Sequence, residues 1–451
     1  MNNKCLELEK ESVGKLLIRY AIPSIIATAT SAIYNITDSI FIGQGVGTDA
    51  LAGITISFPL LILSFAFGLL IGVGASALLS IRLGQKDYES ANLILGNVVV
   101  MSIVVAIVFA IISIPFLKQI LLVFGASSKT LSYAYEFTLI MTLGNVITYL
   151  YFGLNSLIRA LGKPLISMNA TISTVVINVV LNYIFIFVFD WGIKGSAFAT
   201  LISQLLVLMW QIYYLQKPES ILQFKRGIYR LNRTIVLESF SIGLSPFFLN
   251  VAGTVIIILI NRGMLAYGGD LSVGAYGIVN RVSMLFILIV VGLNQGMQPI
   301  AGYNYGAKRF DRVLEVLKKS MLVATAITTI GFLVAELLPN QIANLFTTDK
   351  ILIARVERGI RIVFLIYPLI GFQMVATTLF QSIGKTRQAI FLSLVRQVVF
   401  LIPLLLILPK FFHINGVWFA MPISDAISIV FSTTLLVREM KKLKVSSNII
   451  E

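Results

Sequence analysis

Residues 83–88 read Leu-Gly-Gln-Lys-Asp-Tyr, and residues 305–310 read Tyr-Gly-Ala-Lys-Arg-Phe, so a Gly-x-Lys motif returns after 222 positions. The pair Gly-Lys at 162–163 returns at the same spacing at 384–385. Weaker matches, within two residues of that spacing, join Pro23 to Pro246, Gly53-Ile54 to Gly277-Ile278, and Gly195 to Gly416. The chain therefore reads as one unit written twice, which is typical of membrane carriers with two lobes around a central site.

The composition excludes an ordinary soluble protein. Of 451 residues, 57% are hydrophobic and 12% charged, against roughly 25% charged in soluble domains. The apolar residues form runs of about 20, long enough for a helix to cross a bilayer. We count twelve runs, at 16–41, 51–80, 92–117, 131–157, 165–189, 193–214, 235–261, 272–300, 318–338, 360–382, 388–409 and 414–437. They predict an all-α integral membrane protein with twelve transmembrane helices.

Six spans in each repeat give both copies the same orientation, so we expect two six-helix lobes related by a pseudo-twofold axis along the membrane normal. We predict an N-terminal lobe at 1–215, a polar connector at 216–234, and a C-terminal lobe at 235–451 that ends in a short cytoplasmic tail. Glycine at the repeated turns suits a positive φ, and the lysines beside it suit the lipid phosphate layer.

The 35 Lys and Arg residues fall mostly in the segments on one side of the predicted spans. By the positive-inside rule this predicts a multi-pass protein with both termini in the cytoplasm. We expect the protein in the plasma (inner) membrane. The net charge of +15 then reports topology, and we expect no nucleic-acid partner.

Motifs for catalysis are missing from the sequence. The chain has one cysteine and one histidine, and it has no Cys/His cluster for zinc and no phosphate-binding loop. We therefore expect a protein that is not an enzyme and has no cofactor. Its transport would be driven by an ion gradient or by a separate protein.

Ionisable side chains inside membrane spans cost about 2.5–3.5 kcal/mol each on insertion scales, so each one needs a reason. The clearest is Asp38, near the outer end of the first span. Asn178, Asn182 and Thr200 fall at a similar depth, and Asn35 shares a helix face with Asp38. An acid, amides and a hydroxyl suit a proton or a small hard cation. Either Asp38 changes charge in each transport cycle, or it stays hydrated near the interface and only caps or pairs.

The second half of the chain has Arg281, Arg396 and Asp425 within predicted spans. Arg396 and Asp425 lie on consecutive antiparallel spans. They form either a structural ion pair or a contact with substrate.

Three stretches resemble one known family. Residues 34–43 (Tyr-Asn-Ile-Thr-Asp-Ser-Ile-Phe-Ile-Gly) and 50–54 (Ala-Leu-Ala-Gly-Ile) resemble the first span and first loop of multidrug and toxic compound extrusion (MATE) transporters. Residues 298–307 (Gln-Pro-Ile-Ala-Gly-Tyr-Asn-Tyr-Gly-Ala) resemble the end of the eighth span of that family. The resemblance implies a two-lobe bundle of twelve helices around a V-shaped cavity.

The resemblance also implies antiport of organic cations against H⁺ or Na⁺, with a cation site in the N-terminal lobe. That site carries over to Asp38, Asn178, Asn182 and Thr200, so Na⁺ at Asp38 is the only metal expected. Many relatives have an acid at the position of Asn182, which leaves Asp38 as the sole carboxylate here. Acids found in spans 7 and 10 of another branch are not matched.

The function we expect is multidrug efflux, in which a monomer exports cationic or amphipathic organic compounds in exchange for H⁺ or Na⁺ by alternating access. Its partners would be small-molecule substrates and membrane lipids. The candidate substrate cavity is adaptable and partly charged: Met141, Arg281, Met284, Met297, Tyr303, Arg396 and Asp425.

Two alternatives stay open. A flippase of a related fold for lipid-linked precursors would need a strongly cationic cavity. A membrane scaffold or sensor that transports nothing would leave drug accumulation unchanged.

Overall fold

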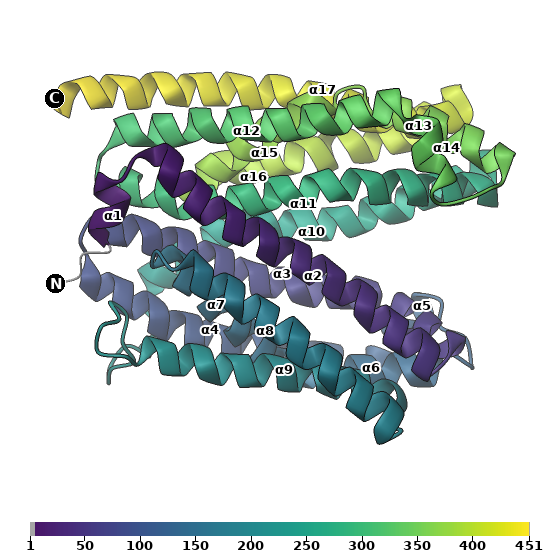
Figure 1. The fold of residues 1–451 in the computed structure, drawn as a ribbon, viewed down its shortest axis with the longest axis horizontal. Helices are drawn as coiled ribbons and strands as arrows, with labels where there is room; N and C mark the ends of the chain where they lie inside the picture. Colours follow the sequence, from purple (N-terminus) through teal and green to yellow (C-terminus); the bar gives the residue numbers. More distant parts are fainter. Residues whose placement is uncertain (1–4, 451) are drawn as a thin grey trace. The chain divides into compact units, whose positions relative to one another are not determined.

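The computed structural model describes residues 5–450, which are almost entirely helical (Figure 1). The first half contains α1 (Cys5–Lys10), α2 (Val13–Gly45), α3 (Thr48–Gly84), α4 (Tyr88–Ser113), α5 (Leu117–Val123), α6 (Leu131–Leu143), α7 (Asn145–Ala160), α8 (Pro164–Tyr183), the π-helical segment η1 (Ile184–Val188) and α9 (Gly192–Leu215). The second half contains α10 (Arg233–Gly268), α11 (Asp270–Gly306), α12 (Phe310–Leu337), α13 (Pro339–Asn344), α14 (Lys350–Phe364), α15 (Tyr367–Ser382), α16 (Thr386–Leu394), the π-helical segment η2 (Val395–Leu401) and α17 (Ile402–Ile450).

Within residues 5–450, nine helices are long and apolar enough to cross a membrane, and two bent helix pairs bring the number to eleven. One of the nine is a stretch of 63 residues, Thr386–Asn448. It contains His413, whose φ of 50° and ψ of −133° are not helical. Division at His413 gives twelve spans. The predicted all-helical membrane fold is confirmed.

The sequence repeat is visible in the backbone at the first pair of turns. After α3 the N–H of Asp87 bonds to the carbonyl of Arg82 at 2.9 Å, and after α11 the N–H of Arg309 bonds to the carbonyl of Asn304 at 2.9 Å. These are the long hydrogen bonds of Schellman motifs, which satisfy carbonyls at the end of a helix.

The left-handed residue of these two motifs is not the expected one. The glycines at 84 and 306 are the last helical residues, and the positive φ falls on Lys86 (62°) and Lys308 (58°). At the second pair of turns glycine has the expected role, because Gly162 and Gly384 have φ of 82° and 73°. The expectation was therefore wrong for the first pair, where lysine accepts the strained conformation.

Two bends also recur at the repeat spacing. The helix axis turns by 54° between α6 and α7 and by 49° between α14 and α15. The second member of each pair begins at Asn145 and at Tyr367, which are 222 positions apart. The glycines before α3 and α11, Gly47 and Gly269, follow the same spacing and both have positive φ. The repeat therefore extends to the breaks in the helices.

By their internal contacts, the helices form two compact units. Of the described residues, unit 1 contains 5–10 and Ile26–Phe247, and unit 2 contains Glu11–Ile25 and 248–450. Helices α2 and α10 therefore each contribute to both units. Pro23 and Pro246 lie inside these helices, within three residues of the change of unit. The predicted lobes at 1–215 and 235–451 stay a prediction.

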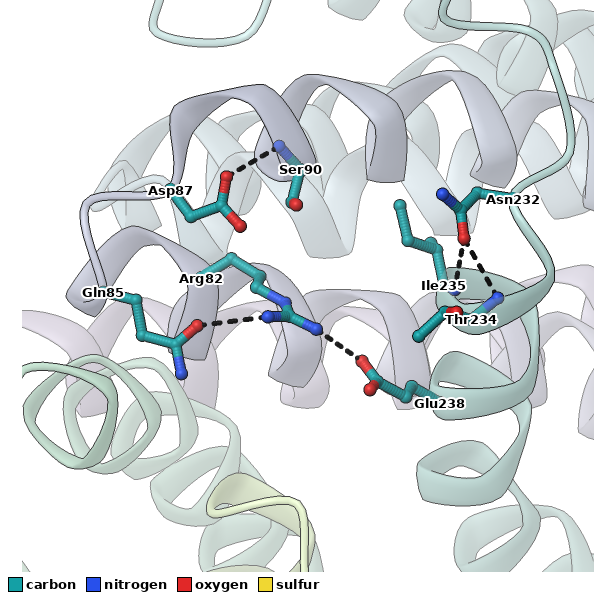
Figure 2. A network of polar contacts seen from close by, with 8 residues as sticks. All are labelled: Arg82, Gln85, Asp87, Ser90, Asn232, Thr234, Ile235 and Glu238. Atoms are coloured by element: carbon teal, nitrogen blue, oxygen red, sulfur yellow. Dashed lines mark hydrogen bonds and ion pairs between the residues drawn. The ribbon is translucent and has the colours of Figure 1, made fainter.

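Polar contacts within unit 1 hold the end of α3 to the start of α10 (Figure 2). The guanidinium of Arg82 donates to Glu238 at 2.9 Å and to Gln85 at 3.3 Å. Asn232 is the N-cap of α10, and its side chain accepts hydrogen bonds from the N–H groups of residues 234 and 235. Asp87 is the N-cap of α4, and its side chain accepts a hydrogen bond from the N–H of Ser90 at 3.0 Å. These side chains satisfy donors that a helix start leaves without partners.

Candidate functional site

Asp38 lies on α2, and its carboxylate is held by two other helices of unit 1. One carboxylate oxygen, Oδ1, accepts a hydrogen bond from Nδ2 of Asn182 on α8 at 2.9 Å and another from Oγ of Ser196 on α9 at 2.9 Å. Both donors are fully buried. Asp38 itself is partly buried, so the acid does not point into bulk water.

The hydrogen bonds continue from Asn182 back to α2. Asn182 donates to Oδ1 of Asn178 at 2.9 Å, and Asn178 donates to Oγ1 of Thr200 at 3.3 Å. Thr200 shares a hydrogen bond of 2.8 Å with the hydroxyl of Tyr34. Tyr34 and Asp38 are four residues apart on α2, so four linked hydrogen bonds run from α2 through α8 and α9 back to α2. We call this network, which one turn of α2 closes, the ring.

Each helix contributes two residues four apart, because a spacing of four places two side chains on one helix face. Asp38 with Tyr34, Asn182 with Asn178, and Thr200 with Ser196 are these pairs. Apolar side chains of unit 1 pack beside the ring. Among them Ile42, one turn after Asp38, is fully buried.

A π-helical segment begins two residues after Asn182. Residues 184–188 form η1, a conformation that often occurs beside functional sites. Ile186 of η1 packs on Gly45 at the end of α2 so closely that a Cβ on Gly45 would overlap it. This contact places the end of α8 beside α2, where the ring forms.

One acceptor in the ring has no donor. Oδ1 of Asn182 is buried and makes no hydrogen bond in the structure of residues 5–450. A buried amide oxygen without a partner costs about 1–3 kcal/mol. Such an oxygen beside a carboxylate would gain a partner if a cation or a protonated group entered the site.

The structure brings together four of the five predicted cation-site residues, Asp38, Asn178, Asn182 and Thr200. The fifth, Asn35, is exposed and donates to the carbonyl of Ser31 on its own helix at 3.0 Å. Tyr34 and Ser196 were missed by the sequence reasoning. Their signal was the four-residue spacing from Asp38 and from Thr200.

The predicted substrate-cavity residues lie in varied surroundings. In unit 2, Arg281 and Met284 are exposed, whereas Met297 and Tyr303 are buried at 0% and 3% exposure. Met141, in unit 1, is partly buried against an apolar cluster.

Arg396 and Asp425 form an ion pair inside unit 2. Nε of Arg396 lies 2.5 Å from Oδ1 of Asp425. Arg396 belongs to η2, and its carbonyl accepts from the hydroxyl of Ser424 at 2.6 Å. The pair matches the structural alternative in geometry, because each charge has the other as its partner.

Across residues 5–450 no group of three or more His, Cys, Asp or Glu side chains could hold a metal ion. A cation in the ring would therefore depend on one carboxylate and on neutral oxygens. Hard monovalent cations and protons suit such a site better than transition metals do.

Two repeats of membrane-spanning helices, with a buried polar ring in one unit, define the class as a polytopic membrane transporter. The MatE family model matches residues 23–184 and 243–407, one segment in each repeat. The chain belongs to the MatE family of multidrug and toxic compound extrusion transporters.

Relatives and solved structures agree with this assignment. The chain is 27% identical to the multidrug export protein MepA of Staphylococcus aureus (strain MRSA252), over 93% of this chain and 92% of MepA. It is 36% identical to the solved MATE multidrug transporter DinF-BH, over 95% of this chain and 96% of that chain, with a TM-score of 0.88. A structure of MATE in the bent conformation matches in fold at 22% identity, over 99% of this chain and 100% of that chain, with a TM-score of 0.92.

Proposed function

We propose that the protein exports cationic or amphipathic organic compounds in exchange for H⁺ or Na⁺, and that Asp38 binds the coupling cation. The observation that carries the proposal is the ring, in which side chains of three helices are hydrogen-bonded together and the carboxylate of Asp38 is the single charged group. The names of MepA and DinF-BH as multidrug transporters support the export of several compounds.

The ring provides what a small cation or a proton needs. The carboxylate supplies the charge, and Asn178, Asn182 and Thr200 supply neutral oxygens nearby. Amide N and O atoms exchange places when the amide group turns, so Asn182 can offer its unpartnered oxygen toward Asp38 once the carboxylate is neutralised. Loss or gain of the cation would thus rearrange hydrogen bonds among α2, α8 and α9.

Alternating access follows from linkage. A cation changes the balance between two conformations only by its difference in affinity for them. Because the ring joins three helices, a change at Asp38 alters the packing of all three. We propose that the protein works as a monomer of two lobes in the plasma membrane, with both termini in the cytoplasm.

The test is transport by purified protein in vesicles, with a pH gradient and a Na⁺ gradient imposed separately. We expect gradient-driven uptake of an organic cation such as ethidium by the wild type and none by Asp38→Asn. Asp49→Asn is the matched control, because Asp49 is an exposed acid in the first turn of α3.

Size-exclusion chromatography and thermal unfolding establish that each variant is folded. If Asp38→Asn took up the compound as fast as the wild type under both gradients, Asp38 would have no part in coupling. If the wild type moved no organic cation under either gradient, export of this class of compound would be excluded.

A further inference from the structure

A second feature of unit 1 lies away from the ring, where helices meet the segment that joins α9 to α10. A cavity of about 210 Å³ opens there. Its walls are Val99 of α4, Leu150 and Leu154 of α7, and Leu208 and Ile212 of α9. Gln216, the residue directly after α9, adds an amide side chain. The part of the lining that comes from the three helices is therefore aliphatic.

The remaining wall comes from the connector, residues 216–232, through Phe224 and Tyr229. Its backbone is fastened to α4. The N–H of Gln223 donates to Asn92 at 2.9 Å, and the N–H of Asn232 donates to Asn97 at 2.9 Å. Asn97 also donates to the carbonyl of residue 230 at 3.2 Å. The connector is thus a fixed part of the cavity and not a loose linker.

The close approach of connector and helix supports the same conclusion. Ile228 packs its backbone on Gly96 of α4, where a Cβ would overlap it. Ile228 and Leu222 are buried at 6% and 0% exposure, so they anchor the connector. A fixed wall means that the cavity is a constant feature of unit 1.

The apolar side chains that line the cavity favour a hydrocarbon chain as its occupant. Apolar cavities stay free of water because a water molecule needs two to four polar partners. An unfilled cavity loses dispersion contacts along its whole lining. In a membrane protein the hydrocarbon at hand is a lipid acyl chain.

The charged residues of the connector indicate which class of lipid the cavity would bind. Residues 216–233 contain one acid, Glu219, and five bases, all of them exposed: Lys217, Lys225, Arg226, Arg230 and Arg233. Lys225 and Arg226 directly follow Phe224, and Arg230 directly follows Tyr229, so these bases are the sequence neighbours of the two connector residues that line the cavity. Lys225 and Arg226 have no carboxylate partner anywhere between residues 5 and 450.

We propose that this cavity holds part of an acyl chain of one anionic phospholipid, whose phosphate group binds Lys225, Arg226 and Arg230. The chain contributes packing, which does not distinguish lipids because acyl chains elsewhere in the bilayer are equally apolar. The selectivity comes from the basic residues, each of which favours an anionic lipid by about fivefold. The bound lipid would fasten α4, α7 and α9 at the connector end of unit 1.

The test mixes purified protein with equal amounts of dimyristoyl phosphatidylglycerol and dimyristoyl phosphatidylcholine in detergent micelles. Native mass spectrometry then counts the lipids that stay bound. We expect the wild type to retain one phosphatidylglycerol in preference to phosphatidylcholine. The double variant Lys225→Gln/Arg226→Gln should lose about 25-fold of that preference, because two cations are removed.

The cavity is tested separately from the charge. Val99→Phe fills it from α4 and Ile212→Phe fills it from α9, and both variants should lose the retained lipid while the connector keeps its charge. Two controls keep the same chemistry elsewhere in unit 1. They are Lys118→Gln/Lys129→Gln, which removes two exposed lysines, and Val104→Phe, which adds a ring at an exposed position of α4.

The controls should retain lipid as the wild type does. Size-exclusion chromatography selects folded variants, and two filling variants on different helices guard against the misfolding of one. Equal retention of the two lipids by the wild type would overturn the proposal. So would undiminished retention by both filling variants, since the chain would then lie elsewhere.

Discussion

Tyr34 and Asp38 stand one turn apart on α2 and enter the same ring of hydrogen bonds at its two ends, Asp38 through Asn182 and Tyr34 through Thr200. The ring needs both positions to close, but only one of them is charged. This difference separates the effects of substitution at the two positions.

Substitution Tyr34→Phe removes one hydroxyl and leaves Thr200 with its bond from Asn178. We expect a loss of stability of about 1 kcal/mol and transport that still responds to the ion gradient. The concentration of coupling cation for half-maximal transport should rise by no more than about fivefold, which corresponds to the same energy. Tyr183→Phe, at an exposed tyrosine of α8, is the control. Complete loss of coupling in folded Tyr34→Phe would give the tyrosine a larger role than the ring predicts.

Substitution Asn182→Asp places a second carboxyl group beside Asp38. Two adjacent acids attract a cation more strongly than one, and we expect the Na⁺ concentration for half-maximal transport to fall at least tenfold, or about 1.4 kcal/mol. Asn92→Asp on α4 keeps its acceptor for Gln223 and serves as the control. If the Na⁺ gradient drives transport by the wild type, an unchanged response of Asn182→Asp to Na⁺ would show that the coupling cation does not occupy the space beside residue 182.

The two repeats differ at the N-cap residue that follows the Gly-x-Lys turn. The side chain of Asp87 caps the N-terminus of α4. Arg309 is the N-cap residue of α12 and makes no capping hydrogen bond, although the two residues have nearly the same φ and ψ. Asp87→Ala should therefore destabilise the protein by about 0.5–1 kcal/mol, and Arg309→Asp should stabilise it by a similar amount. Thermal unfolding of both variants measures the effect.

The contribution of Asp87 should depend on pH. The hydrogen bond from the Ser90 side chain lowers the pKa of the Asp87 carboxyl group. Its stabilising effect is therefore fully present above the pKa of the unfolded state, about 4, and is lost as the pH falls through the lowered pKa. Because Asp87 is only partly buried, we expect the pH-dependent part of its contribution to stability to be about 0.5 kcal/mol. Equal destabilisation by Asp87→Ala at pH 7 and at pH 3 would contradict the assignment.

Lys86 and Lys308 occupy left-handed backbone positions that glycine adopts at lower cost. Lys86→Gly and Lys308→Gly should each stabilise the turn by up to about 1 kcal/mol, less the entropy that glycine adds to the unfolded chain. Gly162→Ala and Gly384→Ala should destabilise their turns for the converse reason. The four variants are compared by thermal unfolding. Destabilisation by both lysine replacements would mean that the lysine side chains hold the turns.

The fold class could be predicted because its signals are visible in the sequence alone. Runs of apolar residues and a spacing of 222 between the Gly-Lys motifs report spans and repeats directly. Asp38 stood out because an acid in an apolar span is costly. Asn178 and Asn182 stood out because two amides four apart share one face.

The rest depended on packing. Serine and tyrosine are common in spans, so the four-residue spacings of Tyr34 from Asp38 and of Ser196 from Thr200 were too weak a signal until α9 and α2 were placed beside α8. The positive φ of Lys86 could not be predicted, because glycine two residues earlier was the better candidate for it. Asn35 lies outside the ring and donates to the carbonyl of Ser31, so its part in cation coupling stays a prediction.

Two helices, α2 and α10, begin in one unit and end in the other, and each carries a proline at that change. Proline removes one backbone hydrogen bond and lowers the cost of a bend. A bend of either helix at its proline would break no further backbone hydrogen bond. The repeated sequence therefore has a proline in each helix that runs from one unit into the other, within one residue of the repeat spacing.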